Sequence, residues 1–311
     1  MSKAIVSTSA NPFHFGHLDI YNKAKEIFDD VIVVIAQNSD KAKSINTNFH
    51  LNAYNIPYEI VFNKTIADYC QENNITHIIR GIRNGVDAEY ELKLDFINKE
   101  LNSNVQTIFI PTNDIYSNVS SSTIRELIKY NKFDIVKKYM NEDAMWRYIY
   151  GEKYACYFGK SCVGKTTYLN NNNIKSINID THLWDVANKI HGEYQTNRFK
   201  EDSRHLIYSD QFTPEEKLKI LHNQDYCFFT NKFWETFFMQ IPSGYALDWA
   251  SVGIYWNLIP SKYRGQLKFI ELSCENSSRE EKIKSKNFTD KIKYIDSLYQ
   301  EPKIVDERIT I

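Results

Sequence analysis

Cysteine and glycine are scarce in this chain of 311 residues, and neither sign of charge is in excess. The five cysteines lack Cys-x-x-Cys spacing, which disfavours a disulfide framework or a cysteine-based zinc site and is typical of a protein of the reducing cytoplasm. No apolar run approaches the ~20 residues that a membrane-spanning helix needs. Lysine and arginine total 38 against 39 aspartates and glutamates, so no global field favours nucleic acid or a membrane surface as a partner. Any anion site must therefore be local, and clusters among the ten glycines become informative.

The length predicts two domains, at ~100–200 residues each. In the first half, short apolar runs typical of strands alternate with helical stretches, and the pattern restarts near residue 150, next to Gly151. We therefore expect one domain over residues 1–149 and a second over 150–311, both of the α/β class. Strands that alternate with helices form parallel sheets, which bind ligands at the carboxyl ends of their strands.

The pattern also places the individual elements. In the first domain the expected strands are Ala4–Ser7, Val31–Ala36, Glu59–Phe62, His77–Ile79 and Gln106–Ile110, and the expected helices are Leu18–Phe28, Ile66–Asn73, Asp87–Leu101 and Ser121–Tyr130. In the second domain the expected strands are Lys153–Phe158, Ser176–Ile179, Tyr245–Leu247 and Leu267–Leu272, with a mostly helical insertion over 183–240 and a helical stretch over Ser277–Ser297.

The strongest single motif follows the first strand of the second domain and fits the phosphate-loop pattern G-x4-G-K-[ST]. Its place between a strand and a helix disfavours the alternative of a chance glycine turn. In such a loop the backbone N–H groups surround phosphate oxygens, the lysine neutralises the β/γ-phosphates, and the last hydroxyl binds Mg²⁺. The residues expected to bind ATP here are Gly159, Lys160, Ser161, Cys162, Val163, Gly164, Lys165, Thr166 and Thr167.

Two aspartates end apolar runs in the same domain. Asp180 ends the expected strand that begins at Ser176, and it is a candidate to hold the acceptor hydroxyl or to act as its base. Asp248 follows Gly244–Leu247 and is a candidate to hold Mg²⁺ together with Thr166. The alternative for each aspartate is a strand-end residue that caps the following turn.

Over roughly residues 153–306 the second domain resembles dephospho-coenzyme A kinase. The resemblance rests on Ile179-Asp180, on Ile207–Asp210 and Glu216–His222 in the helical region, on Leu247-Asp248, and on Lys303–Asp306, which is similar to the family's C-terminal strand. It implies that the domain phosphorylates the ribose 3′-hydroxyl of dephospho-coenzyme A with ATP and Mg²⁺, with Lys165 and Asp180 as catalytic residues.

The chain departs from that family at several positions. His182 stands where the family has a second aspartate implicated in catalysis, Asn223 replaces a proline, and Ala250–Val252 replaces a Pro-Leu-Leu loop. The stretch that resembles the family's lid offers Arg279 beside Lys282, Lys284 and Lys286. His182 or Asp185 is a candidate substitute base, because histidine titrates near neutral pH. The alternative is a domain that binds nucleotide without catalysis.

Three clusters of hydrogen-bond donors stand at strand-to-helix transitions of the first domain. The first is His14-Phe15-Gly16-His17, which places two imidazoles at a helix N-terminus around a residue that lets a ligand approach closely; a metal site is disfavoured because no third ligand is visible. The second is Arg80-Gly81-Ile82-Arg83, followed by Asp87–Leu92, and the third is Val119–Ser122. We expect the three clusters to meet at one sheet edge as an anion site, the alternative being helix caps and surface ion pairs.

These residues resemble phosphopantetheine adenylyltransferase, a nucleotidyltransferase with the H-x-G-H signature, over about residues 3–147. The turn Thr8–Pro12, the Arg80–Arg83 and Asp87–Glu91 segments, the helix start Val119–Ser122 and Asn38–Lys41 carry the likeness. The resemblance implies a Rossmann-like fold and direct attack of the 4′-phosphate of phosphopantetheine on the α-phosphorus of ATP. The loop after Lys41 is shorter than in the family, and the family's Phe-x4-Arg stretch is missing.

The resemblance also implies roles for single residues. His17 contacts the α-phosphate, Ser9 and Lys41 hold the attacking phosphate, and Arg80 orients the acceptor. His17, Lys41 and Arg83 are the implied catalytic residues, and the residues implied to bind ATP are Ser9, His14, Gly16, His17, Gly81, Arg83, Glu91, Ser120, Ser121 and Ser122.

Together the two halves resemble a bifunctional coenzyme A synthase, which would take ATP, 4′-phosphopantetheine and dephospho-coenzyme A as substrates, use Mg²⁺ and form homo-oligomers. One rival interpretation is a nicotinamide mononucleotide adenylyltransferase fused to a ribosylnicotinamide kinase, which the Arg80–Arg83 and Asp87–Glu91 segments disfavour. An RNA-end kinase is disfavoured because the chain has no basic stripe.

Overall fold

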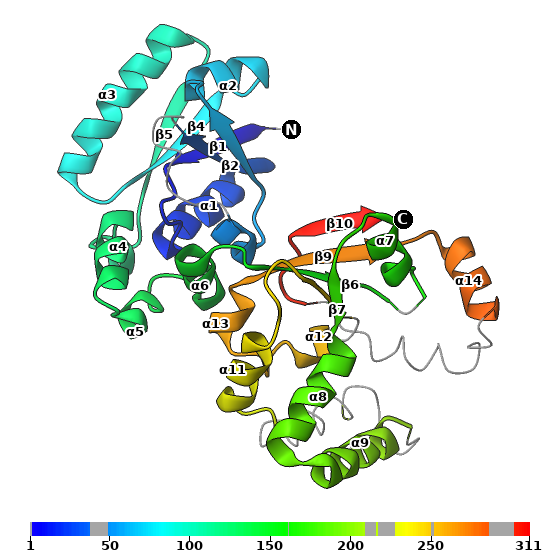
Figure 1. The fold of residues 1–311 in the computed structure, drawn as a ribbon. Coiled ribbons are helices and arrows are strands. Elements are labelled where there is room, and N and C mark those ends of the chain that lie inside the picture. Colours follow the sequence, from blue (N-terminus) through cyan, green and yellow to red (C-terminus); the bar gives the residue numbers. More distant parts are fainter. Residues whose placement is uncertain are drawn as a thin grey trace. The chain divides into compact units, whose positions relative to one another are not determined.

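The computed structural model describes residues 2–37, 49–160, 162–208, 216, 228–249, 252–285 and 302–311 (Figure 1). The expected site residues Lys41 and Ser161 lie outside these ranges, as do Asn223, Lys286 and most of the segments 38–41, 209–222 and 250–252. The chain divides into two compact units, Met1–Gly151 and Glu152–Ile311. Within the described residues, no helix combines the length and apolar character that crossing a membrane requires.

The first unit contains a parallel sheet with strand order β3-β2-β1-β4-β5. Its strands are β1 (Lys3–Thr8), β2 (Asp30–Gln37), β3 (Tyr58–Phe62), β4 (His77–Ile82) and β5 (Gln106–Pro111). Its helices are α1 (Phe15–Ile27), α2 (Ile66–Glu72), α3 (Gly85–Leu101), α4 (Ser121–Lys129), α5 (Phe133–Val136) and α6 (Glu142–Tyr150), with short 3₁₀ helices η2 (Phe49–Tyr54) and η3 (Asp114–Tyr116). The expected parallel α/β sheet is thereby confirmed.

Alternating residues of the strands bury the two faces of this sheet. Ala4 and Val6 of β1 belong to the core beneath α1 and η2, whereas Ile5 between them belongs to the core beneath α2. This is the period-2 pattern of a strand covered on both sides. Strands β1 and β4 are neighbours, but the helices that follow them cover opposite faces: α1 follows β1, whereas α3 follows β4 and packs beside α2. A crevice therefore opens between the carboxyl ends of β1 and β4, where α/β sheets bind ligands.

Two helices of the first unit start earlier than expected, each because of a side-chain cap. The imidazole of His14 accepts the Gly16 N–H, so α1 begins at Phe15 rather than at Leu18. The amide of Asn84 accepts the Asp87 N–H, so α3 begins at Gly85. Both caps satisfy backbone donors that a helix start leaves unpaired.

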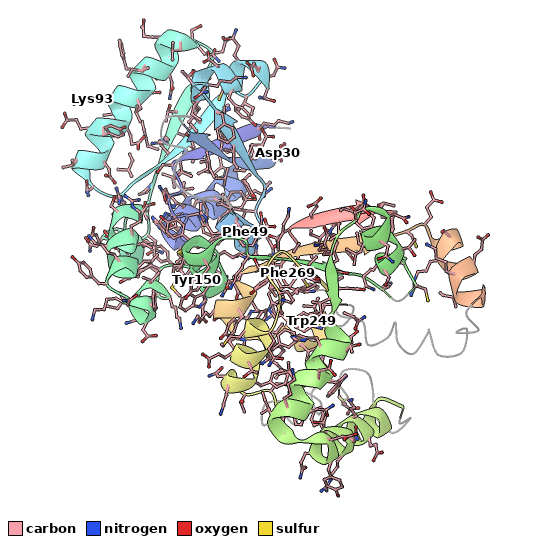
Figure 2. All side chains as sticks on the ribbon, viewed as in Figure 1. Asp30, Phe49, Lys93, Tyr150, Trp249 and Phe269 are labelled. Atoms are coloured by element: carbon pink, nitrogen blue, oxygen red, sulfur yellow. The ribbon has the colours of Figure 1, made fainter. Side chains whose placement is uncertain are left out.

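The second unit contains another parallel sheet, with strand order β10-β9-β6-β8-β7. Its strands are β6 (Tyr154–Phe158), β7 (Ser176–Asn178), β8 (Ala246–Asp248), β9 (Leu267–Ser273) and β10 (Glu307–Thr310). Its described helices are α7 (Lys165–Asn171), α8 (Ile179–His191), α9 (Glu193–Tyr208), α11 (Asn231–Met239), α12 (Val252–Tyr255), α13 (Ser261–Arg264) and α14 (Asn276–Ser285). Fully buried aromatic side chains such as Trp234, Phe237 and Trp249 fill one part of its core, and Trp249 and Phe269 are marked in Figure 2.

Two expectations for the second unit are wrong. Asp180 does not end a strand: β7 stops at Asn178, whose side chain accepts the Thr181 N–H at 3.0 Å and starts α8, so Asp180 lies in the first helical turn. The C-terminal strand does not cover Lys303–Asp306 but begins at Glu307, because pairing with β9 starts only where the Asp306 N–H donates to the Phe269 carbonyl at 2.8 Å.

Candidate functional sites

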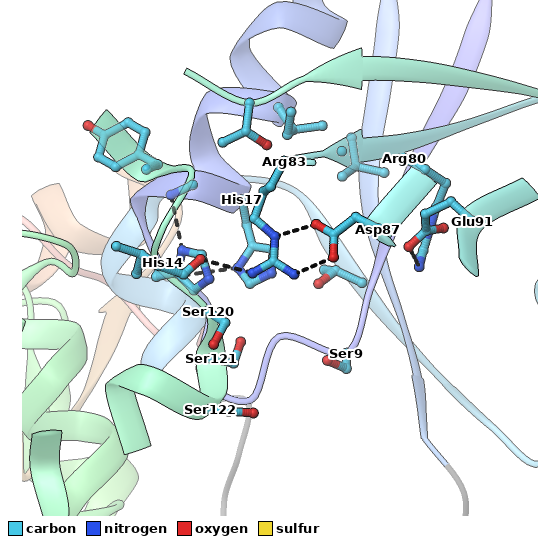
Figure 3. A pocket seen from close by; sticks show the side chains of 18 of the residues that line it. Ser9, His14, His17, Arg80, Arg83, Asp87, Glu91, Ser120, Ser121 and Ser122 are labelled. Atoms are coloured by element: carbon cyan, nitrogen blue, oxygen red, sulfur yellow. Dashed lines mark hydrogen bonds and ion pairs between the residues drawn. The ribbon is translucent and has the colours of Figure 1, made fainter. Parts of the chain in front are cut away.

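A cavity of about 370 Å³ opens at the carboxyl ends of β1 and β4 in the first unit (Figure 3). All three donor clusters contribute to it, so the expectation that they meet at one sheet edge agrees with the geometry. The expected site residues that line it are Ser9, His14, Gly16, His17, Arg80, Gly81, Arg83, Glu91, Ser120, Ser121 and Ser122.

The local fold fixes the tautomers of the two histidines. The Nδ1 atom of His14 accepts the Gly16 N–H at 3.1 Å, and the Nδ1 atom of His17 accepts the His14 N–H at 3.2 Å. A neutral imidazole with Nδ1 as acceptor carries its proton on Nε2. Both rings therefore offer Nε2–H donors. A Cβ on Gly16 would lie 2.9 Å from Cε1 of His14, so a larger residue there would displace this imidazole.

Both histidines are neutral near pH 7. Burial, reinforced by the Arg83 guanidinium, lowers the pKa of His14 from 6.5 to about 4. Burial, followed by repulsion from a protonated His14 and from the Arg83 guanidinium, holds the pKa of His17 well below its ordinary value. The positive charge of the cavity therefore comes from arginines, and the histidines act as uncharged donors.

An NMR titration of the imidazole nitrogens is expected to show no protonation of His14 or His17 between pH 7.5 and 5.5. Between pH 6.5 and 4 the unfolded chain binds a proton at His14 and the folded chain does not, so acidification through this window lowers the free energy of unfolding. The loss from His14 should reach about 2 kcal/mol at pH 5. Titration of both rings near pH 6.5 would contradict the conclusion that both histidines are neutral donors.

Arg80 is held by two neighbours. Its Nε and Nη2 atoms lie 2.5 and 2.7 Å from the two carboxylate oxygens of Glu91, and its Nη1 donates to the Ser7 carbonyl at 2.5 Å. This forked pairing fixes the guanidinium plane while leaving it at the cavity wall. A smaller cavity of about 100 Å³ adjoins the same two residues and is also lined by Leu94, Asn98 and Thr107.

Arg83 is positioned by a residue that the sequence analysis did not single out as functional. Asp87 binds its Nε and Nη2 atoms at 2.5 and 2.9 Å, and the Val119 carbonyl accepts from its Nη1 at 3.1 Å (Figure 3). The i, i+4 spacing of Arg83 and Asp87 was the available signal. Arg83 thereby joins the start of α3 to the segment that precedes α4.

The start of α4 is also fastened to the loop after β1. The Ser121 hydroxyl donates to the Pro12 carbonyl at 2.9 Å, and Arg125 donates to the Asn11 carbonyl. Arg125 lines the cavity and donates to the Ser122 hydroxyl at 3.0 Å. It is a second functional candidate that sequence reasoning missed, because its partner Asn11 lies more than a hundred residues away along the chain.

In the second unit the phosphate-loop motif connects β6 to α7, as expected. Gly159 and Gly164 have φ angles of 149° and 105°, which only glycine adopts readily, and a Cβ on Gly159 would lie 2.2 Å from the Leu272 carbonyl oxygen. The Lys165 Nζ lies 3.4 Å from the Gly159 carbonyl oxygen. Burial lowers the pKa of Lys165, while the charges of Asp248 and Asp180 act in the opposite direction.

Asp248 is buried at the end of β8, where its Oδ2 accepts the Thr166 hydroxyl at 3.3 Å. His182 is a buried residue of α8 whose Nε2 lies 3.1 Å from the Phe237 carbonyl oxygen and whose ring packs on Phe237.

Comparisons with known proteins identify the first unit. The family model for cytidylyltransferase-like proteins matches residues 5–127. Phosphopantetheine adenylyltransferase of Borrelia duttonii is 33% identical over 147 residues, which are 43% of this chain and 87% of that protein. The enzyme of the same name from Staphylococcus carnosus is 36% identical over 141 residues, again 43% of this chain and 87% of that protein.

Among solved structures, NadR protein in complex with NAD and AMP-PNP covers 96% of this chain and 95% of its own at 14% identity, with a TM-score of 0.34. A structural likeness of that size supports no argument about function. Sequence identities of 33% and 36% over 87% of two adenylyltransferases do show to which family the first unit belongs. Through its N-terminal 43%, the chain belongs to the phosphopantetheine adenylyltransferase family.

Proposed function

We propose that the first unit transfers the adenylyl group of ATP to 4′-phosphopantetheine, giving dephospho-coenzyme A and pyrophosphate. The observation that carries this proposal is the single cavity in which all described residues implied to bind ATP and acceptor meet. Membership of the adenylyltransferase family agrees with it. The segments Arg80–Arg83 and Asp87–Glu91, which carry the family resemblance, disfavour the nicotinamide mononucleotide alternative.

In this proposal the chain acts by positioning and by charge stabilisation rather than as a nucleophile. The 4′-phosphate oxygen bonds to the α-phosphorus while the bond from that phosphorus to the bridging oxygen of pyrophosphate breaks. The Nε2–H groups of His14 and His17 donate to triphosphate oxygens, His17 at the α-phosphate where charge develops. Arg83 and the donors at the start of α4, Ser120–Ser122, hold the departing pyrophosphate.

The acceptor lies on the side of Arg80. Because Glu91 and Ser7 fix the guanidinium, Arg80 presents a preorganised cation to the attacking phosphate together with Ser9. The smaller cavity beside Arg80, with Leu94 and Asn98 in its lining, suits an acceptor tail that combines apolar and amide groups. Lys41 completes the proposed acceptor site on the strength of the family resemblance.

For the second unit we infer phosphorylation of the ribose 3′-hydroxyl of dephospho-coenzyme A. The loop with Gly159, Gly164 and Lys165 supports binding of the ATP phosphates, and Asp180 is the proposed group at the acceptor hydroxyl. Thr166 and Asp248 present a hydroxyl and a carboxylate side by side, the oxygen donors that Mg²⁺ prefers, and would hold it together with substrate phosphates. Bound there, Mg²⁺ would neutralise charge on the phosphoryl oxygens.

One observation favours a second candidate for this unit. At the position where the kinase family has its second aspartate, the chain has His182, which is buried and has its Nε2 at the Phe237 carbonyl rather than a free carboxylate. A domain that binds ATP without transferring phosphate is therefore the alternative to an active kinase.

The test is incubation of the whole chain with ATP, Mg²⁺ and 4′-phosphopantetheine, followed by chromatography of the products. Dephospho-coenzyme A that is then converted to coenzyme A is the expected result. Accumulation of dephospho-coenzyme A alone would reject the kinase proposal and favour the binding domain. No pyrophosphate release would overturn the adenylyltransferase proposal.

We also propose that the protein forms homo-oligomers through the outer face of α3. Leu92, Phe96 and Ile97 share one patch of this helix and are 50–65% exposed, and the only buried residue of the helix is Glu91. The face also carries Glu89 and Lys93, opposite charges 2.8 Å apart that are complementary to a second copy of themselves across a two-fold axis; Lys93 is marked in Figure 2.

A substitution on this face should change the mass in solution. Phe96→Lys is expected to lower the mass measured by light scattering during size-exclusion chromatography, because it places a charge in an apolar contact. Tyr130→Lys, at a residue that is 63% exposed on another surface, is the matched control and should leave the mass unchanged. Equal masses for the wild type and Phe96→Lys would reject this interface.

A further inference from the structure

The 3₁₀ helix η2 contacts the residue before the His14–His17 turn, and its side chains do not line the cavity. The adenylyl transfer proposed above assigns them no role. We propose that His50, with Tyr54, is the positioning residue of the adenylyltransferase site: the two side chains fix the backbone of Phe13, which in turn fixes His17. This inference rests on the proposed adenylyl transfer and deepens it.

Two hydrogen bonds fix Phe13 to η2. The Nε2 atom of His50 accepts the Phe13 N–H at 2.8 Å, and His50 is fully buried. The hydroxyl of Tyr54 donates to the Phe13 carbonyl at 3.1 Å and accepts the Asn141 N–H at 3.2 Å. Both the N–H and the carbonyl of Phe13 are thus hydrogen-bonded to side chains of η2.

The ring of Phe13 contacts the imidazole of His17 and so couples the position of the Phe13 backbone to that of His17. It is fully buried, stacks on the His17 imidazole at 5.2 Å between centroids, and meets the Tyr54 ring edge-on at 4.9 Å. A shift of the Phe13 backbone therefore shifts the aromatic surface on which the His17 ring rests. The same shift reaches His14, whose backbone N–H defines the tautomer of His17.

Two further hydrogen bonds of this turn come from other elements. Ser121 of α4 binds the Pro12 carbonyl, and the Tyr139 carbonyl accepts the Phe15 N–H at 2.8 Å. These two hydrogen bonds hold the residues on either side, Pro12 and Phe15, whereas the backbone of Phe13 is hydrogen-bonded to η2. Loss of the His50 acceptor would leave a buried N–H without its partner and free the centre of the turn to move.

A misplacement of this kind should affect the transition state more than substrate binding. Displacement of a reacting group by about 1 Å can cost ~10²-fold in rate. Because His17 is proposed to act on charge that builds during transfer, kcat and kcat/KM for ATP should fall together.

Three variants separate positioning from stability. His50→Leu removes the acceptor, whereas His50→Gln places an amide oxygen at about the reach of Nε2. Leu51→Ala, at a fully buried core residue of the same 3₁₀ helix, is the control for general loosening of η2. For each variant we would measure kcat and KM for pyrophosphate release, Tm, and the imidazole nitrogen shifts of His14 and His17.

His50→Leu is expected to lower kcat about 10- to 100-fold and to average the tautomer signals of His17. His50→Gln should stay within about threefold of the wild type, and Leu51→Ala should lower Tm while keeping kcat and the tautomers. Folded His50→Leu with wild-type kcat and fixed tautomers would overturn the inference, as would an equal loss of kcat in Leu51→Ala. If the wild type released no pyrophosphate, the proposed function would fail, while the tautomer signals would still decide whether His50 positions His17.

Discussion

His17→Ala is expected to lower kcat/KM for pyrophosphate release by about 10²–10³-fold, because it removes a preorganised donor aimed at developing charge. The imidazole is half-buried and neutral, and its ring is oriented by the His14 N–H so that its Nε2–H faces the cavity. Stopped assays with 4′-phosphopantetheine and ATP measure the effect.

Two controls accompany this prediction. His77→Ala removes a histidine of the same sheet that does not line the cavity and should keep wild-type turnover. Phosphorylation of added dephospho-coenzyme A should also remain, because the second unit has its own phosphate loop. A loss below tenfold in His17→Ala would show that another group stabilises the transition state.

Lys165→Ala should have the complementary effect. Phosphorylation of dephospho-coenzyme A is expected to fall at least about 10²-fold, because the ammonium proposed to neutralise the β/γ-phosphates is lost, while pyrophosphate release from the first unit is expected to be unchanged. The measurement is transfer of labelled phosphate from ATP to dephospho-coenzyme A.

Lys175→Ala, a lysine of the same unit outside the loop and between α7 and β7, is the matched control and should keep its kinase rate. Loss of both activities from either His17→Ala or Lys165→Ala would contradict two independent sites. Unchanged phosphate transfer in Lys165→Ala would reject the role given to the loop.

The sequence predicts those features of the fold and the site that depend on local residue patterns. The two parallel sheets follow from apolar runs that alternate with helical stretches, and the cavity residues follow from motifs at strand-to-helix transitions such as His14–His17 and Arg80–Arg83. Parallel topology brings such transitions to the same sheet edge, so short motifs suffice to predict where they meet.

What escaped prediction depends on long-range contacts or on a single cap. Arg125 reaches Asn11 and His50 reaches Phe13 across segments that no periodicity connects. Asp180 lies in a helix rather than at the expected strand end, because the side chain of Asn178 accepts the Thr181 N–H and starts α8 there. The protonation state of His14 and His17 is likewise a property of the folded chain, because burial beside Arg83 lowers the pKa of both side chains.

The most direct test of the central claim is a comparison of acceptors for pyrophosphate release by the whole chain. With ATP and Mg²⁺ held constant, kcat/KM would be measured for 4′-phosphopantetheine and for nicotinamide mononucleotide. The arrangement of Arg80, Glu91 and the adjoining cavity predicts that 4′-phosphopantetheine is preferred by about 10³-fold or more. Equal or better use of nicotinamide mononucleotide would contradict the account.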